Sequence, residues 1–176
     1  MWNRHVILAA LALLGDKGEL GPPCQLEHVV DLERRLDVRF PESYRDFVLQ
    51  VGDGGAGPGQ GLWPLRRSAR WADRGVYSPR YLATPFPFTA RVPGEYFDDL
   101  DDDDLLTGSM VIAEIGHGSY FRMVVTGETC GRVWRDDVRL GGSLSPGLDF
   151  ADWYTNWLQR LGVLKGSPRG RRRLVD

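Results

Sequence analysis

The sequence predicts an α+β fold in which helices flank an antiparallel sheet of four to six strands. Three observations lead to this prediction. Apolar residues recur with helical spacing near both ends of the chain, residues 109–134 form short apolar stretches, and glycine-bearing turns separate those stretches. With 42% hydrophobic and 11% aromatic residues among 176, we expect one packed domain over residues 1–164.

Three helices are predicted in the first third of the chain, at about residues 2–14, 25–36 and 41–51. In the third helix Tyr44, Phe47, Val48 and Val51 share one face, and Gly52 is expected to end the helix in a left-handed conformation. The buried side of the second helix is expected to contain Leu26, Val29, Val30, Leu32 and Leu36.

The apolar run from Val6 to Leu14 raises the question of a targeting segment. It is too short to span a bilayer. The single preceding Arg4 and the lack of a small-residue cleavage site favour a buried helix over a signal peptide. We therefore expect a cytoplasmic protein with no membrane partner.

A proline corner and a glycine-rich loop surround the third helix. Pro41 suits the first helical turn because its ring fixes φ and its missing N–H would have no intrahelical partner there. The loop from Gly52 to Gly61 continues neither helix nor strand. The apolar residues that follow predict a short strand, interrupted by Pro64: Leu62, Trp63 and Leu65.

This stretch resembles the SUKH superfamily, which includes a fungal cell-wall-assembly regulator and many bacterial immunity proteins of toxin systems. Over residues 26–65 the matching pattern is a helix glutamate, an apolar-proline corner, Tyr-Arg-x-Phe, a glycine-rich loop and Gly-Leu-Trp-Pro-Leu. A weaker part of the resemblance covers residues 108–161, where a strand, a Gly-x-Gly turn, a strand, a second turn and Gly-x-Val match the family's sheet. Phe40 and Asp37 depart from the family's usual Leu and Gly. The resemblance implies structural roles for Glu33, Pro41, Tyr44, Phe47, Gly54, Gly55, Gly61 and Trp63. We interpret Glu33 as a helix residue that caps or pairs with nearby arginines (Arg34, Arg35 or Arg45).

Residues 66–107 are predicted to form an aromatic, proline-rich insertion with an acidic loop. A short helix is expected near residues 68–74, and four prolines between residues 79 and 93 prevent long regular structure. Seven carboxylates then fall between Glu95 and Asp104, and such a run is expected to be exposed because it repels itself.

The second half predicts an antiparallel meander followed by a helix. Strands are expected at residues 110–115, 120–125 and 131–134, and residues 141–147 are expected to be a loop. Asp149 is a suitable N-cap for an amphipathic helix ending near Gly162. Residues 165–176 carry Lys165, Arg169, Arg171, Arg172 and Arg173 and are expected to be a basic, mobile tail.

The sequence contains no convincing catalytic or metal site. The glycine-rich loop lacks the strand–loop–helix context and the Gly-Lys-Ser/Thr ending of a phosphate-binding loop. Cys24 and Cys130 are interpreted as reduced thiols, and the three histidines have no ligand spacing. The aspartate run lacks the alternation of a calcium loop. We therefore expect no cofactor and no enzymatic activity, and the net charge of −2 does not favour nucleic acid.

The resemblance implies a protein-binding function, and the low lysine content suggests a GC-rich bacterial genome. The leading hypothesis is an immunity protein that neutralises a cognate toxin, often a nuclease in this family. Two alternatives stay open: a general regulatory or scaffold module, and a divalent-metal-binding protein that uses the aspartate cluster. An acidic surface would steer association with a basic cleft, and an aromatic residue would anchor the contact. The expected contact residues are Glu95, Tyr96, Phe97, Asp98, Asp99, Asp101, Asp102, Asp103 and Asp104.

Overall fold

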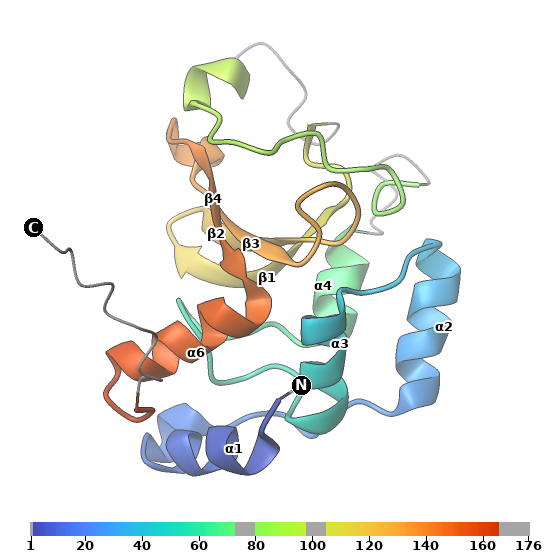
Figure 1. Cartoon of the computed structure of the whole chain (residues 1–176). Coiled ribbons are helices and arrows are strands. Elements are labelled where there is room, and N and C mark those ends of the chain that lie inside the picture. Colours follow the sequence, from blue (N-terminus) through green and yellow to red (C-terminus); the bar gives the residue numbers. More distant parts are fainter. Residues whose placement is uncertain (1, 73–79, 98–104, 166–176) are drawn as a thin grey trace, which may run out of the picture.

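Helices from both ends of the chain lie below a central antiparallel sheet in the view of Figure 1. The computed structural model describes residues 2–72, 80–97 and 105–165. The helices are α1 (Arg4–Ala12), α2 (Leu26–Leu36), α3 (Glu42–Gln50), α4 (Leu65–Ala72) and α6 (Phe150–Arg160), and the 3-10 turns are η1 (Gly15–Gly18), η2 (Gly94–Phe97) and η3 (Val138–Leu140). None of the helices in these ranges is both long and apolar enough to cross a membrane.

The sheet is a four-stranded antiparallel meander in the order β1-β2-β3-β4. Its strands are β1 (Ser109–Gly116), β2 (Ser119–Val124), β3 (Arg132–Asp136) and β4 (Leu144–Asp149). The predicted α+β class and the first three strands are confirmed. His117 lies in the tight turn between β1 and β2 with a φ of 55°, exposed to solvent.

The prediction of a loop over residues 141–147 was wrong, because β4 begins at Leu144. Leu144 exchanges two backbone hydrogen bonds with Val92 on the outer side of the strand. Backbone groups two residues apart point the same way, so the nitrogen of Pro146 also faces outward. A proline is tolerated there because an edge position needs no N–H donor. Periodicity alone does not identify such a strand.

The predicted strand over Leu62–Leu65 was also wrong. Leu62 forms only isolated bridges, to Gly55 and to Ala113 of β1, and Leu65 already begins α4. The carboxylate of Asp53 accepts a hydrogen bond from the Leu65 backbone N–H at 2.7 Å, which satisfies a donor at the helix start. Pro64 precedes this first turn, so the chain enters a helix where apolar content had indicated a strand.

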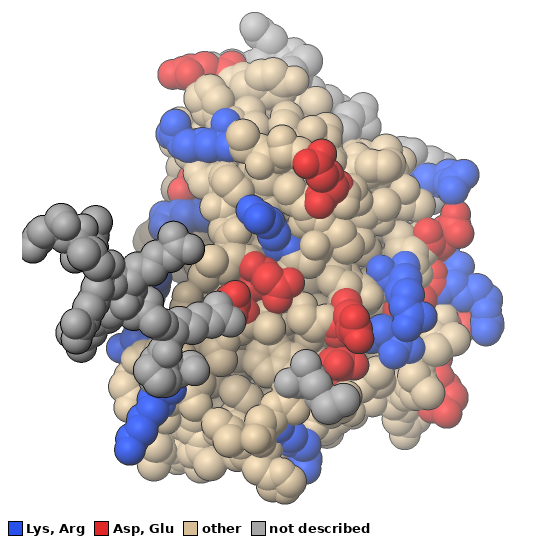
Figure 2. All heavy atoms as spheres, viewed as in Figure 1, with Lys and Arg blue, Asp and Glu red and all other residues tan. Residues whose placement is uncertain are grey.

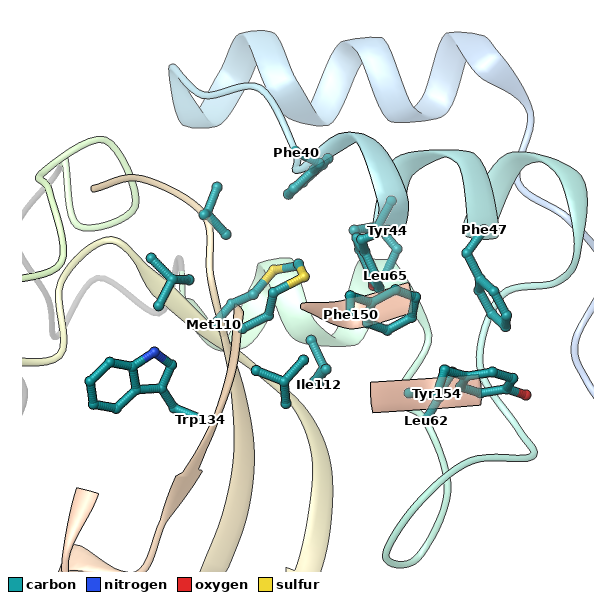
Figure 3. Packing of buried hydrophobic residues seen from close by; sticks show 14 of the residues in the cluster. Phe40, Tyr44, Phe47, Leu62, Leu65, Met110, Ile112, Trp134, Phe150 and Tyr154 are labelled. Atoms are coloured by element: carbon teal, nitrogen blue, oxygen red, sulfur yellow. The ribbon is translucent and has the colours of Figure 1, made fainter. Parts of the chain in front are cut away.

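A cluster of aromatic rings joins the N-terminus, α3 and α6. The indole of Trp2 lies 5.1 Å from the ring of Phe47, and Phe47 lies 4.7 Å from Tyr154. The Trp2 indole N–H also donates to the backbone carbonyl of Ser43 at 2.6 Å. Figure 3 shows the α3 side chains Tyr44 and Phe47 pointing toward Phe150 and Tyr154. This cluster fixes α1 and α6 beside the start of α3.

Two helix details differ from the sequence prediction. The C-cap of α3 is Val51, whose backbone conformation is right-handed, and Gly52 does not have a positive φ. Gly52 is instead required by packing, because a Cβ there would lie 2.8 Å from the carbonyl oxygen of Gly21. Leu26, expected on the buried side of α2, is 50% exposed, whereas Val29 is fully buried.

Residues 80–97 cover the sheet with few regular elements, as the proline content predicted. Phe86 lies 5.1 Å from the indole of Trp134 on β3, and Phe88 packs against Phe97. The short helix predicted at 68–74 begins earlier, at Leu65. The predicted final helix is confirmed as α6, with Asp149 as its N-cap and Gly162 in a left-handed conformation.

Candidate partner-binding surface

A charged pair joins the end of α2 to the start of α3. One carboxylate oxygen of Glu33 accepts from the Phe40 backbone N–H at 3.0 Å and from Nε of Arg45 at 3.1 Å. Glu33 is 8% exposed, so these bonds form in a largely desolvated place. The interpretation of Glu33 as a structural residue agrees with this geometry. The left-handed C-cap of α2 is Asp37, with a φ of 54°, at the position where glycine is common in the family.

The other motif residues expected to be structural also lie in the core or in tight backbone turns. Pro41, Tyr44, Phe47 and Trp63 are buried, and the Arg67 guanidinium lies 3.8 Å from the Trp63 ring. Gly54, Gly55 and Gly61 have positive φ. At Gly55 a Cβ would lie 2.4 Å from the backbone oxygen of Glu19, so only glycine fits.

The acidic stretch expected to bind a partner is described only at its start. Glu95 and Tyr96 lie on η2, and Tyr96 is 48% exposed. Phe97 is 4% exposed and packs against the ring of Phe88, so it is a core residue and not a surface anchor. The residues that carry most of the charge lie outside the described ranges: Asp98, Asp99, Asp101, Asp102, Asp103 and Asp104.

A second acidic surface is a groove of about 630 Å³ where α1, α3 and α6 begin. Its carboxylates are Glu42, Asp46 and Asp149, and no lysine, arginine or histidine is among the described residues that line it. None of the ion pairs among the described residues involves these three carboxylates. Figure 2 shows acidic side chains near the middle of the face on which α3 and the start of α6 lie in Figure 1.

The groove combines this charge with apolar walls. Trp2, Val6 and Ile7 come from the N-terminal segment, and Leu164 follows α6. Helix N-termini carry roughly +0.5 charge each, so three of them amount to about +1.5. Three carboxylates at neutral pH carry about −3. The groove is therefore net negative and suits a cationic side chain with an apolar stem.

A smaller hollow of about 320 Å³ lies between α2 and the start of α4. It is lined by Cys24, His28 and Asp53 together with Arg35 and Arg66. Burial, a hydrogen bond to Asp53 and the charge of Asp53 together raise the pKa of the Cys24 thiol to about 12. A thiol held protonated is a poor nucleophile and a poor metal ligand. Within the described residues no group of three or more His, Cys, Asp or Glu side chains is arranged to hold a metal ion.

The acidic groove was not predicted from the sequence. Asp149 was predicted to be the N-cap of the final helix, but no sequence signal groups it with Glu42 and Asp46. The carboxylates of α3 and the Asp149 cap of α6 form a common surface only because the starts of these two helices meet, and that meeting depends on the Trp2 contacts with α3 and α6. A local sequence signal exists for the Asp149 cap but not for its approach to α3.

Comparisons with known proteins agree with the motif. A search of curated proteins found no match to this chain. The model of the SMI1 / KNR4 family (SUKH-1) matches residues 23–156, which is about three quarters of the chain. The match includes Glu33, the proline corner at Pro41, the glycine-rich loop, the whole sheet and the first turns of α6. The chain therefore belongs to the SMI1 / KNR4 family (SUKH-1).

Proposed function

We propose that the chain is a non-enzymatic, protein-binding domain that neutralises a cognate bacterial toxin partly through acidic surfaces. Family membership supports a protein-binding role of this kind. The observation that carries the proposal is the groove whose charged lining residues are all acidic (Glu42, Asp46 and Asp149). A nuclease toxin has a basic cleft for its phosphate substrate, and such a cleft complements an acidic surface.

The two acidic surfaces have different expected roles. The stretch from Glu95 to Asp104 supplies a high density of charge, which would accelerate diffusional encounter. Tyr96, an exposed residue of the same stretch, supplies an aromatic anchor. The groove has apolar walls around its carboxylates, so it would hold individual cationic side chains after encounter. The first surface should therefore set the association rate and the second the dissociation rate.

The test begins with capture of partners by the tagged chain at low salt and their release at high salt. A genuine toxin must also be harmful when expressed alone and harmless when co-expressed with this chain. Two variants then separate the surfaces: one changes the six aspartates of residues 98–104 to Asn, and the other combines Glu42→Gln, Asp46→Asn and Asp149→Asn. Asparagine is also a good N-cap, so the Asp149 change keeps the start of α6 intact.

We expect the six-aspartate variant to associate about tenfold or more slowly at low salt and to lose most of its salt dependence. We expect the groove variant to dissociate faster. A control matched to the groove variant in its charge change combines Asp16→Asn, Glu27→Gln and Asp31→Asn on other surfaces, and it should leave both rates nearly unchanged. If both acidic-surface variants neutralised the toxin with unchanged rates, the acidic-surface mechanism would be wrong.

A further inference from the structure

We propose that the acidic groove is occupied, in the free protein, by the arginine-rich segment 166–176 of the same chain. The groove would then be a binding site for an internal ligand that a toxin has to displace. This inference concerns the chain without any partner, so it stands or falls independently of the toxin proposal. It rests on charge complementarity, on apolar complementarity and on the place where the described chain ends.

Charge complementarity favours this occupant. Segment 166–176 contains Arg169, Arg171, Arg172, Arg173 and Asp176, so its side chains carry a net charge of 4 − 1 = +3. The described lining of the groove has three carboxylates and no basic side chain. Arginine pairs with carboxylates through a planar fork of donors and keeps its charge on partial burial. The side-chain charges of the segment and of the groove's carboxylates are therefore equal in size and opposite in sign.

Apolar complementarity points the same way. The arginines are followed by Leu174 and Val175, which are apolar residues in an otherwise polar segment. The groove offers Trp2, Val6 and Ile7 as apolar surface beside its carboxylates. Arginine stems also cover apolar surface while their guanidinium groups remain with the carboxylates. Both the charged and the apolar parts of the segment therefore have counterparts in the groove.

The segment begins at the groove. Leu164 lines it, and Lys165 is the last residue that the structure describes. Eleven residues can extend over roughly 36–40 Å, so the arginines reach the carboxylates without strain. A short tether also holds the segment at an effective concentration on the order of millimolar. Even a weak intrinsic affinity would then give substantial occupancy.

An anion is the alternative ligand for the groove, because helix N-termini attract anions. Asp149 already accepts the Ala151 backbone N–H at 2.9 Å, which satisfies one donor of α6. Asn3 accepts the Val6 backbone N–H at 3.2 Å and does the same for α1. Two further carboxylates, Glu42 and Asp46, lie on α3. An added anion would meet more negative charge than the helix ends offset, so a cationic segment is the better fit.

Cys130 provides a reporter because its exposed thiol lines the groove, whereas Cys24 lines the separate hollow. In the full chain, Leu174→Cys places a second thiol in the segment and keeps all four arginines. Equilibration with reduced and oxidised glutathione measures the effective concentration of the two thiols, and peptide mapping identifies the disulfide. We expect a bridge between residues 130 and 174 that weakens at least about tenfold between 20 mM and 1 M salt, because salt screens the pairing.

The groove substitutions give the matched comparison. The same Leu174→Cys chain carrying Glu42→Gln, Asp46→Asn and Asp149→Asn should lose the salt dependence. The control carrying Asp16→Asn, Glu27→Gln and Asp31→Asn should keep it. If bridge formation is equal at both salt concentrations in the native groove, the proposal is refuted, and that measurement does not depend on how well any groove variant folds.

A competition assay provides a second readout. The probe is a synthetic peptide with the sequence of residues 165–176, titrated into full-length chain and followed by NMR. Changing Arg169, Arg171, Arg172 and Arg173 to Ser in the protein should strengthen peptide binding at least about threefold, since the competing internal ligand is lost. Equal affinity in both proteins, or shifts confined to residues away from the groove, would contradict occupancy by the segment. Failure of the chain to bind a toxin would not contradict occupancy, because the peptide titration contains no toxin.

Discussion

Removal of the Glu33 carboxylate should destabilise the fold more than removal of any exposed carboxylate. The carboxylate serves two donors at once, the Phe40 backbone N–H and the Arg45 side chain. The Glu33 and Arg45 side chains are 10% and 15% exposed, so water replaces the lost partner poorly. Two substitutions separate the contributions: Glu33→Gln keeps an acceptor for the backbone, and Glu33→Ala removes both interactions.

The expected magnitudes follow from this geometry. A hydrogen bond to a charged group contributes about 1.5–3 kcal/mol, so Glu33→Gln should cost about that much by leaving Arg45 without its anion. Glu33→Ala also leaves the buried Phe40 N–H unpaired, which adds about 1–3 kcal/mol. The total, about 2.5–6 kcal/mol, is centred on the range of about 3–5 kcal/mol found for breaking one side of a buried ion pair.

Urea unfolding followed by tryptophan fluorescence measures these costs. With an m-value of about 2 kcal/mol per molar urea, Glu33→Gln should lower the midpoint by about 1 M and Glu33→Ala by about 2 M. Asp31→Ala is the matched control, because its pair with Arg34 is 3.9 Å long and both side chains are mostly exposed. Its midpoint should change by less than about 0.25 M. A Glu33→Ala midpoint equal to that of the control would refute the reasoning.

Three further outcomes concern two buried tyrosine hydroxyls, a glycine in a tight turn and the two thiols. Tyr154→Phe should cost about 1–2 kcal/mol in urea unfolding, since its hydroxyl donates to a buried loop carbonyl at 2.9 Å, whereas Tyr44→Phe should be neutral or stabilising because that buried hydroxyl has no hydrogen-bond partner among the described residues. Gly55→Ala should cost about 2–5 kcal/mol, because its φ of 99° is unfavourable and the new Cβ would meet a backbone oxygen at 2.4 Å; a loss under 1 kcal/mol would contradict this. Alkylation followed by mass spectrometry should modify exposed Cys130 before Cys24 at pH 8, and the Cys24 rate should keep rising about tenfold per pH unit to pH 11, since only the thiolate reacts and its pKa is raised to about 12.

The sequence was sufficient to predict the elements whose local signals agree with their tertiary setting. The final helix has an N-cap, an amphipathic face and a terminal glycine, and it forms as α6 from Phe150. The three predicted strands have apolar runs bounded by glycine turns and form as β1, β2 and β3. In each case propensity, periodicity and turn chemistry indicate the same structure.

The failures occurred where tertiary contacts override those signals. Leu62 and Trp63 have the apolar content of a strand, but the Asp53 side chain caps the following residues as a helix. The edge strand β4 contains proline and glycine, and only its bonds to Val92 and to β3 reveal it. Phe97 sits beside an acidic run in the sequence and yet packs inward. None of these outcomes is encoded within one short window of residues.

The groove shows why a family motif leaves part of a binding surface unpredicted. The matched residues 23–156 supply its carboxylates, Glu42, Asp46 and Asp149. Its apolar walls, Trp2, Val6 and Leu164, come from residues outside that match. The indole of Trp2 therefore has two tasks: it completes the aromatic cluster and it forms a wall of the groove. Segments that flank the matched family region can thus give a common fold a surface of its own, and the arginine-rich segment 166–176 follows directly from one of those walls.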